Sequence, residues 1–222
     1  MDAKFNIAKL IDHTLLKPEA TETDIKKLCK EAEKYGFFSV CVNPCFIKTA
    51  REKLSGTDVK VSTVIGFPLG AMHSKVKIYE AMFAVLAGAD EVDVVINIGM
   101  IKSNNWTAVQ KEISDLVTAT PDVIHKIIIE TYYLSDDEKI NASLAVMKSG
   151  AEFVKTSTGF APSGATVKDI EMIKAATKGK IGIKAAGGIR TLKDVLTFIK
   201  AGATRIGTSS GVKIMEELAR EK

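Results

Sequence analysis

The chain has 222 residues and a formal net charge of +4, with its basic and acidic side chains interleaved along the sequence. Hydrophobic residues make up 46% of it and charged residues 26%, which is ordinary for a globular protein. The sequence contains no basic stripe with aromatic partners, no apolar run long enough to span a membrane and no apolar core of a signal peptide at its start. We therefore expect a cytoplasmic protein that binds neither nucleic acid nor a membrane.

Cysteine and histidine spacing gives no sign of a metal site. The three cysteines, Cys29, Cys41 and Cys45, are odd in number and lack CxxC spacing, which argues against a disulfide framework or a zinc site. The three histidines show no i, i+4 pairing of the kind that metal-binding helices use. We therefore predict no bound metal.

Short β-branched runs alternate with longer segments of helical spacing along the chain. The predicted strands cover residues 11–16, 38–42, 60–66, 91–97, 125–131, 152–157, 180–185 and 204–209. The predicted helix starts carry capping signatures at Thr21–Asp24, Ser135–Glu138, Thr166–Asp169 and Thr191–Asp194. In the helix that follows Thr191, the apolar face is predicted to contain Leu192, Val195, Leu196 and Ile199.

The alternation of strands and helices predicts a closed barrel. AGADEVDVV, SGAEFVKTS and AGATRIGTS each place a glycine where a helix would end and then begin a strand. A doubly wound open sheet is the alternative, but it calls for a glycine fingerprint after the first strand, and this chain has none. No linker divides the chain. We predict one α/β domain over residues 1–222, a single (β/α)8 TIM barrel with a short N-terminal helix.

Two predicted strands contain lysines that should point into the barrel. In KIGIKA, Ile181 and Ile183 share one face, so Lys184 belongs to the opposite, inward face. Lys155 lies in the preceding strand, EFVKTS, and both lysines are near the C-terminal strand ends, where barrel enzymes carry their catalytic groups. Buried lysines are rare because desolvation of an ammonium group is costly. The presence of two such lysines on neighbouring strands therefore suggests a catalytic role.

Proximity of the two amines would change their protonation. Two unit charges about 4 Å apart repel by roughly 4 kcal/mol at an effective dielectric constant of about 20. Such a repulsion would lower one lysine pKa by about 3 units from about 10.4, and burial would act in the same direction. A neutral amine is the form that attacks a carbonyl to give a Schiff base. Asp93, which also points inward by strand parity, and Asp12 are candidates for moving protons.

Glycine- and serine-rich segments follow the last two predicted strands. AAGGIRT and RIGTSSGV each lead into a helix, at the position where barrel enzymes bind phosphate through backbone N–H groups. STGFAPSGAT, which contains Thr158, follows the Lys155 strand and offers further donors, so Thr158 is a candidate substrate-binding residue. These segments predict a small phosphorylated substrate with its carbonyl end toward the lysines.

Each of these features also has a purely structural interpretation. A lone strand lysine more often forms an ion pair than a covalent bond to substrate. Asp93 could serve only to pair with a lysine, and the glycine-rich segments could be tight turns. Cys41 is expected to fill space in its strand. The presence of two inward lysines together with an inward aspartate and these loops favours catalysis.

The motifs taken together resemble the deoxyribose-phosphate aldolase family of class I aldolases. The likeness covers nearly the whole chain through IDHTLLKPEAT, VCVNP, TVIGFPLGA, GADEVDVVIN, FVKTSTGF, IKAAGGIR and IGTSS. It implies that Lys155 forms the Schiff base, that Lys184 lowers its pKa and that Asp93 relays protons. It also implies substrate-binding positions at Asp12, Cys41, Gly187, Gly188, Ser209 and Ser210.

The implied reaction is the reversible cleavage of 2-deoxy-D-ribose 5-phosphate to D-glyceraldehyde 3-phosphate and acetaldehyde. No cofactor is implied, because the imine is the electron sink, and we also expect a homo-oligomer, a dimer or a tetramer. The chain departs from some relatives in having Phe160, not lysine, after KTSTG and in having no tyrosine after Tyr133. The alternatives are a catalytically inactive phosphosugar-binding barrel and a Schiff-base aldolase with a different donor.

Overall fold

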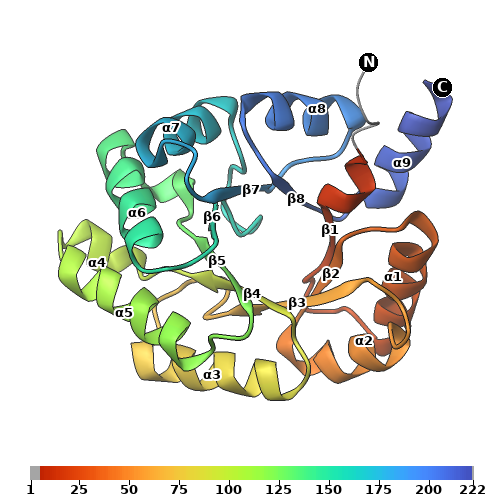
Figure 1. Ribbon diagram of the computed structural model, residues 1–222, viewed down its shortest axis with the longest axis horizontal. Helices are drawn as coiled ribbons and strands as arrows, with labels where there is room; N and C mark the ends of the chain where they lie inside the picture. Colours follow the sequence, from red (N-terminus) through yellow and green to blue (C-terminus); the bar gives the residue numbers. More distant parts are fainter. Residues whose placement is uncertain (1–5, 222) are drawn as a thin grey trace.

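Eight parallel strands pair in chain order and close into a barrel in the computed structural model, which describes residues 6–221 (Figure 1). The strands are β1 Ile11–Leu15, β2 Ser39–Val42, β3 Lys60–Ile65, β4 Glu91–Val95, β5 Ile124–Ile128, β6 Phe153–Lys155, β7 Gly182–Ala186 and β8 Arg205–Thr208. Each predicted strand is present, and the sheet closes through the pairing of β8 with β1. The predicted TIM barrel is confirmed.

Helices surround the barrel and cover its outer face (Figure 1). They are α1 Glu22–Tyr35, α2 Ile47–Lys53, α3 Ser74–Leu86, α4 Ile98–Lys102, α5 Trp106–Ala119, α6 Asp136–Lys148, α7 Val167–Thr177, α8 Leu192–Ala201 and α9 Gly211–Arg220. Short 3-10 helices are η1 Ile7–Leu10, η2 Pro44–Phe46 and η3 Thr131–Tyr133. The predicted N-terminal helix is therefore the single turn η1. Within residues 6–221, no helix has the length and the apolar content that crossing a bilayer requires.

Strand parity separates an apolar outer face from a polar interior. On β4, Val92 and Val94 belong to the large apolar cluster between strands and helices, whereas Glu91 and Asp93 take part in ion pairs inside the barrel. On β7, Ile183 belongs to the same outer cluster and Lys184 is fully buried inside. Alternate residues of a strand face opposite sides of the sheet, and both sides are buried in a barrel. Most of the apolar core therefore lies outside the strands.

The predicted helix caps are present, and one predicted apolar position is wrong. Thr21, Ser135 and Thr191 each form a capping box with the acidic residue three positions later, and Thr166 accepts the backbone N–H of Asp169. Leu196, predicted to share the buried face of α8, is 46% exposed. The buried stripe of α8 is centred nearer Val195, so that Leu196 falls at its border.

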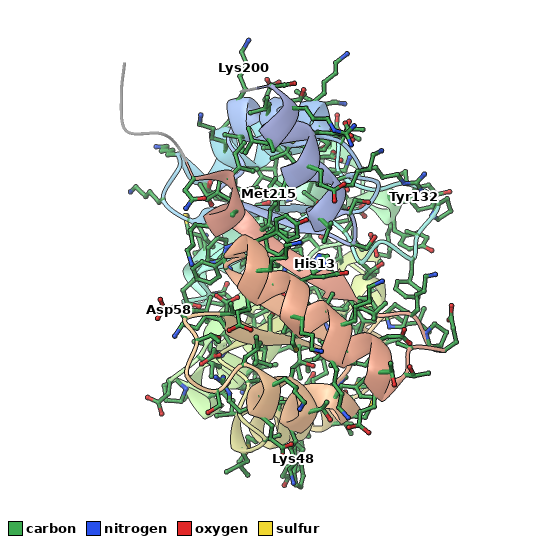
Figure 2. The ribbon with its side chains drawn as sticks, turned by 90° about the vertical axis from the view of Figure 1, so that its right-hand side faces the viewer. His13, Lys48, Asp58, Tyr132, Lys200 and Met215 are labelled. Carbon is green, nitrogen blue, oxygen red and sulfur yellow. The ribbon has the colours of Figure 1, made fainter. Side chains whose placement is uncertain are left out.

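The loops that follow the strands gather at one end of the barrel axis. Tyr132, which follows β5, lies toward the right in Figure 2, and Asp58, which precedes β3, lies toward the left. In barrels of this kind, the end that carries the loops after the strands is the catalytic one. The glycine- and serine-rich segments after β7 and β8 belong to this same end.

A buried ion pair joins α3 to α5 outside the barrel. Lys77 is fully buried, and its Nζ lies 2.7 Å from Oε1 of Glu112 and 2.8 Å from the carbonyl oxygen of Val95. The second carboxylate oxygen of Glu112 accepts the hydroxyl of Ser74 at 2.7 Å. Burial lowers the pKa of Lys77, while the Glu112 carboxylate opposes that change. This pair needs both members, because an unpaired charge in that position would remain desolvated.

Replacement of Glu112 by alanine should therefore destabilise the fold strongly. We expect a loss of about 3 kcal/mol or more in the free energy of unfolding, measured by urea denaturation, because Lys77 is left buried without its carboxylate. The double variant Lys77→Met with Glu112→Leu should recover most of this loss. Lys111→Ala, which breaks an exposed pair with Asp115 on the same helix, is the control and should cost less than about 1 kcal/mol. Equal effects of Glu112→Ala and Lys111→Ala would contradict the argument.

Candidate active site

Ionised side chains fill the interior of the barrel. Among residues 6–221, the interior ion pairs join Asp12, Glu91, Asp93, Lys126, Lys155, Lys184 and Arg205. Ser39 donates its hydroxyl to Asp12 at 2.8 Å, and Ser62 accepts from Lys126 at 3.1 Å, so that each of the eight strands contributes a polar side chain. We call this set of nine side chains the interior network. Its members are buried, which makes their mutual pairing obligatory.

Asp93 lies at the centre of the interior network. Its Oδ2 accepts Nζ of Lys155 at 2.7 Å and Nζ of Lys184 at 2.6 Å, and its Oδ1 accepts Nζ of Lys126 at 2.8 Å. Burial by itself would raise the pKa of Asp93, but the charges of Lys126, Lys155 and Lys184 bring this pKa well below its usual value. Asp93 therefore stays ionised, and it holds the amines of Lys155 and Lys184 no more than two hydrogen-bond lengths apart.

The two predicted lysines have opposite protonation tendencies. Lys184 contacts two carboxylates, since its Nζ also lies 2.5 Å from Oδ2 of Asp12. Burial would lower the pKa of Lys184, but Asp12 and Asp93 raise it above its usual value. Lys155 contacts Asp93 alone among the carboxylates of the described chain. Its pKa is lowered by burial first and then by the charge of Lys184, against the opposing effect of Asp93.

The charges of the interior network agree with a neutral Lys155. Its described members include three carboxylates and four basic side chains, so full ionisation would leave one uncompensated positive charge in the barrel. Loss of one proton from Lys155 brings the set to electrical balance. The charge of Lys184 acts on the pKa of Lys155 in the predicted direction, although burial is the larger cause of the lowering, and Asp12 raises the pKa of Lys184 but does not contact Lys155.

A cavity of about 300 Å³ opens above Lys155 at the C-terminal end of the strands. Among the described residues of the interior network, Lys155 is the member that lines this cavity. The other charged side chains on the cavity wall are Lys17, in the segment after β1, and Arg190, in the segment after β7. The described wall contains no carboxylate, so the cavity favours an anionic ligand that carries a group reactive toward an amine.

Closely packed glycines join the loops that follow β6 and β7. A side chain at Gly164 would come within 2.1 Å of the carbonyl oxygen of Gly187, and Gly187 and Gly188 have φ angles of 88° and 78°. These positions therefore require glycine, for contact or for backbone conformation. Backbone N–H groups that lie at such a wall before a helix are typical ligands of phosphate.

The predicted substrate-binding residues fall into three groups. Thr158, Gly187, Gly188 and Ser209 line the cavity together with Lys155. Ser210 lies beside it, at the N-cap of α9, where it lines a neighbouring hollow with His13.

Asp12 and Cys41 lie deeper than the cavity and are fully buried. Asp12 acts on Lys184 and Arg205, whereas Cys41 packs with Leu16 and Val64 in a small apolar cluster inside the barrel. Burial raises the pKa of the Cys41 thiol.

Three charged members of the interior network were not identified from the sequence: Glu91, Lys126 and Arg205. Arg205 lies 2.8 Å from Oδ1 of Asp12 and 3.1 Å from Oε2 of Glu91, and Lys126 lies 2.8 Å from the same Glu91 oxygen. Strand parity could have found Glu91 and Lys126, because Glu91 shares the face of Asp93 in EVDVV and Lys126 alternates with Ile127 in HKIII.

No group of three or more His, Cys, Asp or Glu side chains within residues 6–221 is arranged to hold a metal ion. The three cysteines are free thiols, of which Cys29 and Cys41 are buried and Cys45 is exposed. The chemistry that this site offers through its own side chains is that of an amine beside an ionised carboxylate.

Comparison with known proteins relates this geometry to an enzyme family. The model of the family described as DeoC/LacD family aldolase matches residues 6–217. The deoxyribose-phosphate aldolase of Caldanaerobacter subterraneus subsp. tengcongensis is 53% identical over 223 residues, which cover 99% of this chain and 96% of the relative. The solved structure of QR15, an aldolase, has a TM-score of 0.94 at 43% identity and covers 98% of this chain and 97% of its own. A tetrameric deoxyribose phosphate aldolase from Aeropyrum pernix has a TM-score of 0.90 at 36% identity, with 97% and 92% covered.

The interior network predicts how Lys155 responds to the loss of Lys184. In Lys184→Met, a cationic neighbour of Lys155 is removed and Asp12 and Asp93 lose a shared partner, and both changes raise the pKa of Lys155. An amine with a raised pKa is less often neutral at a given pH. Labelling of Lys155 by an amine reagent, followed by mass spectrometry across a pH series, should therefore shift to higher pH and slow several-fold at pH 7.

The control for this experiment is Lys111→Met, which removes an exposed charge on α5. It should leave the labelling profile of Lys155 unchanged. A profile of Lys184→Met that coincides with the control, or that moves to lower pH, would show that Lys184 does not hold Lys155 neutral.

Proposed function

The chain belongs to the DeoC/LacD family of aldolases, and from that premise we propose that it cleaves 2-deoxy-D-ribose 5-phosphate reversibly to D-glyceraldehyde 3-phosphate and acetaldehyde. As a member of this family it is a carbon–carbon lyase. The observation that carries the proposal is the position of Lys155, whose pKa is lowered and which is held by Asp93 at the floor of a cavity with basic walls. The whole chain works as one catalytic domain.

The reaction begins with the neutral amine of Lys155. It attacks the aldehyde carbon, C1, of the open-chain sugar phosphate. The hydroxyl of the resulting carbinolamine takes up a proton and leaves as water, which gives a protonated imine. The C3 hydroxyl gives up its proton to water and its oxygen forms a carbonyl with C3 as the C2–C3 bond breaks. The electron pair of that bond forms the C1–C2 double bond, and the protonated imine becomes a neutral enamine. Glyceraldehyde 3-phosphate leaves. Protonation of the enamine at C2 and hydrolysis of the resulting imine release acetaldehyde and restore Lys155.

Asp93 and Lys184 have different tasks in this sequence. Asp93 lies 2.7 Å from Nζ of Lys155, within reach of each proton that the nitrogen gains or loses. Its carboxylate also stabilises the positive charge of the imine, which forms in the same place. Lys184 keeps its proton and favours the neutral amine before substrate arrives. Asp12 acts through Lys184, which it contacts at 2.5 Å.

The phosphate group is placed at the outer wall of the cavity. Backbone N–H groups of Gly187, Gly188 and Ser209 are its proposed ligands, and the charges of Lys17 and Arg190 attract the dianion. Ser210, beside the cavity, donates its backbone N–H to the Thr208 hydroxyl at 2.9 Å, so it is left with its own hydroxyl for a ligand. Phe160 forms part of the same wall, and its ring packs edge-on against the ring of Phe67, with 5.1 Å between the two ring centroids. Lys17 and Arg190 thus supply the positive charge of the cavity wall, where this chain has Phe160 in place of the lysine of some relatives.

Assembly into a homo-oligomer, a dimer or a tetramer, is proposed through α3, which lies at the outside of the barrel (Figure 1). Val76, Tyr79, Phe83 and Leu86 repeat at helical spacing and are 51%, 61%, 71% and 82% exposed. With Leu69, Met72 and Met82 they present on the order of 800 Å² of apolar surface, about what each partner of a stable interface buries. A second copy of the chain is the proposed occupant. The cytoplasm is the proposed compartment, where free cysteines stay reduced.

Trapping of the imine tests the nucleophile and the donor together. Incubation with acetaldehyde and borohydride should add one reduced two-carbon adduct to the chain, and peptide mapping should place it on Lys155. Lys155→Met should form no adduct and lose sugar cleavage by at least about a thousandfold, because no other amine lies at the cavity floor in the described residues.

A panel of donors completes this experiment. Dihydroxyacetone-type donors should give little adduct compared with acetaldehyde. An adduct on Lys184 or Lys126 would reject the assignment of the nucleophile, and tight binding of the sugar phosphate with neither adduct nor cleavage would indicate a binding protein. Lys111→Met, which removes an exposed lysine on α5, serves as the control variant and should form the same adduct as wild type.

The α3 face gives a separate prediction about assembly. Phe83→Glu together with Leu86→Glu should lower the mass measured by light scattering to that of one chain, since the charges would be desolvated in the interface. The matched control is Lys75→Gln, an exposed position on the same helix. Wild-type protein that already has the mass of one chain, or a double variant that keeps the wild-type mass, would exclude α3 as the interface.

A further inference from the structure

Glu130 has an unusual backbone conformation at the end of β5. Its φ and ψ angles are 52° and 71°, in the left-handed region that side chains other than glycine rarely adopt. Its neighbours are fixed on both sides, because Ile129 donates its N–H to the carbonyl of Lys155 at 3.0 Å and Thr131 donates to that of Thr156 at 2.9 Å. The residue is 2% exposed. Such outliers are common at functional sites, where the surrounding structure enforces them.

The Glu130 carboxylate holds the loop that follows the Schiff-base lysine. Its Oε2 accepts both the backbone N–H of Thr158, at 3.1 Å, and the Thr158 hydroxyl. The other oxygen, Oε1, is buried without a hydrogen-bond partner in the described residues. The described chain offers no basic partner to this carboxylate either, in contrast to the acids of the interior network. A buried acid held so incompletely costs stability, which calls for an explanation.

Thr158 lines the cavity together with Gly159, Phe160 and Lys155. Its hydroxyl has one proton to donate and two lone pairs. The proton goes to Glu130, and one lone pair accepts the backbone N–H of Phe160 at 3.0 Å. One lone pair is left for a ligand. Thr158 therefore offers the cavity a hydrogen-bond acceptor and no donor, and Glu130 is the residue that fixes this polarity.

We propose that Glu130 is a positioning residue that turns the Thr158 hydroxyl into an acceptor for a hydroxyl group of the substrate. The ligand chemistry is that of a sugar chain, in which a hydroxyl proton lies a few bonds from the carbonyl carbon that bonds to Lys155. This inference rests on the proposed function, since it assigns a contact within the same cavity. It adds a contact that acetaldehyde, which has no hydroxyl, cannot make.

Two substrates therefore separate positioning from a general structural role. In Glu130→Ala, kcat/KM for cleavage of 2-deoxy-D-ribose 5-phosphate should fall about tenfold, the usual effect of losing one hydrogen bond. The rate of borohydride trapping with acetaldehyde should stay within about twofold of wild type. Glu130→Gln should restore sugar cleavage to within about threefold, because the amide oxygen can accept both bonds from Thr158.

Thr158→Val supplies the second arm of the test and is close to isosteric with the native residue. By itself, Thr158→Val should lower kcat/KM for the sugar phosphate as Glu130→Ala does and leave acetaldehyde trapping unchanged. Added to Glu130→Ala, it should lower kcat/KM for the sugar phosphate by no more than about a further twofold. If Glu130→Ala does not fold, as judged by thermal melting, Glu130→Gln and Thr158→Val carry the test. Equal losses for both substrates, no loss for either, or additive losses in the double variant would overturn the proposal.

Failure of this inference is distinct from failure of the proposed function. Wild-type protein that neither traps acetaldehyde nor cleaves the sugar phosphate would end the proposed function. Wild-type protein that does both, with Glu130→Ala and Thr158→Val equally active on the sugar, would end the role of Glu130 alone.

Discussion

One carboxylate shared by three lysines is the interaction on which the interior of this barrel depends. Asp93 contacts Lys126, Lys155 and Lys184 at 2.6 to 2.8 Å, and all four side chains are buried. Neither the ammonium groups nor the carboxylate could be desolvated alone without a large penalty. The closed sheet satisfies this condition because it brings β4, β5, β6 and β7 around one axis, so that side chains far apart in the sequence share a common partner.

The same arrangement distinguishes the nucleophile from its neighbour. Mutual repulsion between Lys155 and Lys184 is symmetric and cannot decide which amine loses its proton. The asymmetry comes from Asp12 on β1, which contacts Lys184 and raises its pKa, while Lys155 has Asp93 alone and a lowered pKa. The positions of the two lysines also favour Lys155 as the nucleophile, because Lys155 lines the cavity whereas Lys184 is fully buried. Two like groups are thus pushed toward opposite protonation states, as in many acid–base sites.

Sequence periodicity was enough for the barrel and for part of the site. Each predicted strand is present, and parity placed Lys184 and Asp93 inside because their neighbours are branched apolar residues. Parity is less clear for Lys126 and Arg205, because each follows another polar residue, His125 or Thr204, so that the contrast between an apolar and a polar face is weaker. Asp12 was named, but its effect on Lys184 depends on closure of the barrel. The left-handed backbone of Glu130 has no signal in the sequence, because a glycine or an asparagine usually marks such a position.

The division of the molecule into two cores explains how so many charges can occupy its centre. Apolar residues from the outer faces of the strands and the inner faces of the helices form one large cluster, and the apolar cluster inside the barrel is small. Burial in the outer cluster provides most of the hydrophobic stabilisation. Apolar side chains of similar volume in the interior would often be as stable as ion pairs or more so. The interior network is therefore best understood as a cost in stability that the outer cluster offsets. In return it places the Asp93 carboxylate and the Lys184 ammonium group beside the amine of Lys155, whose pKa is lowered first by burial and then by the charge of Lys184.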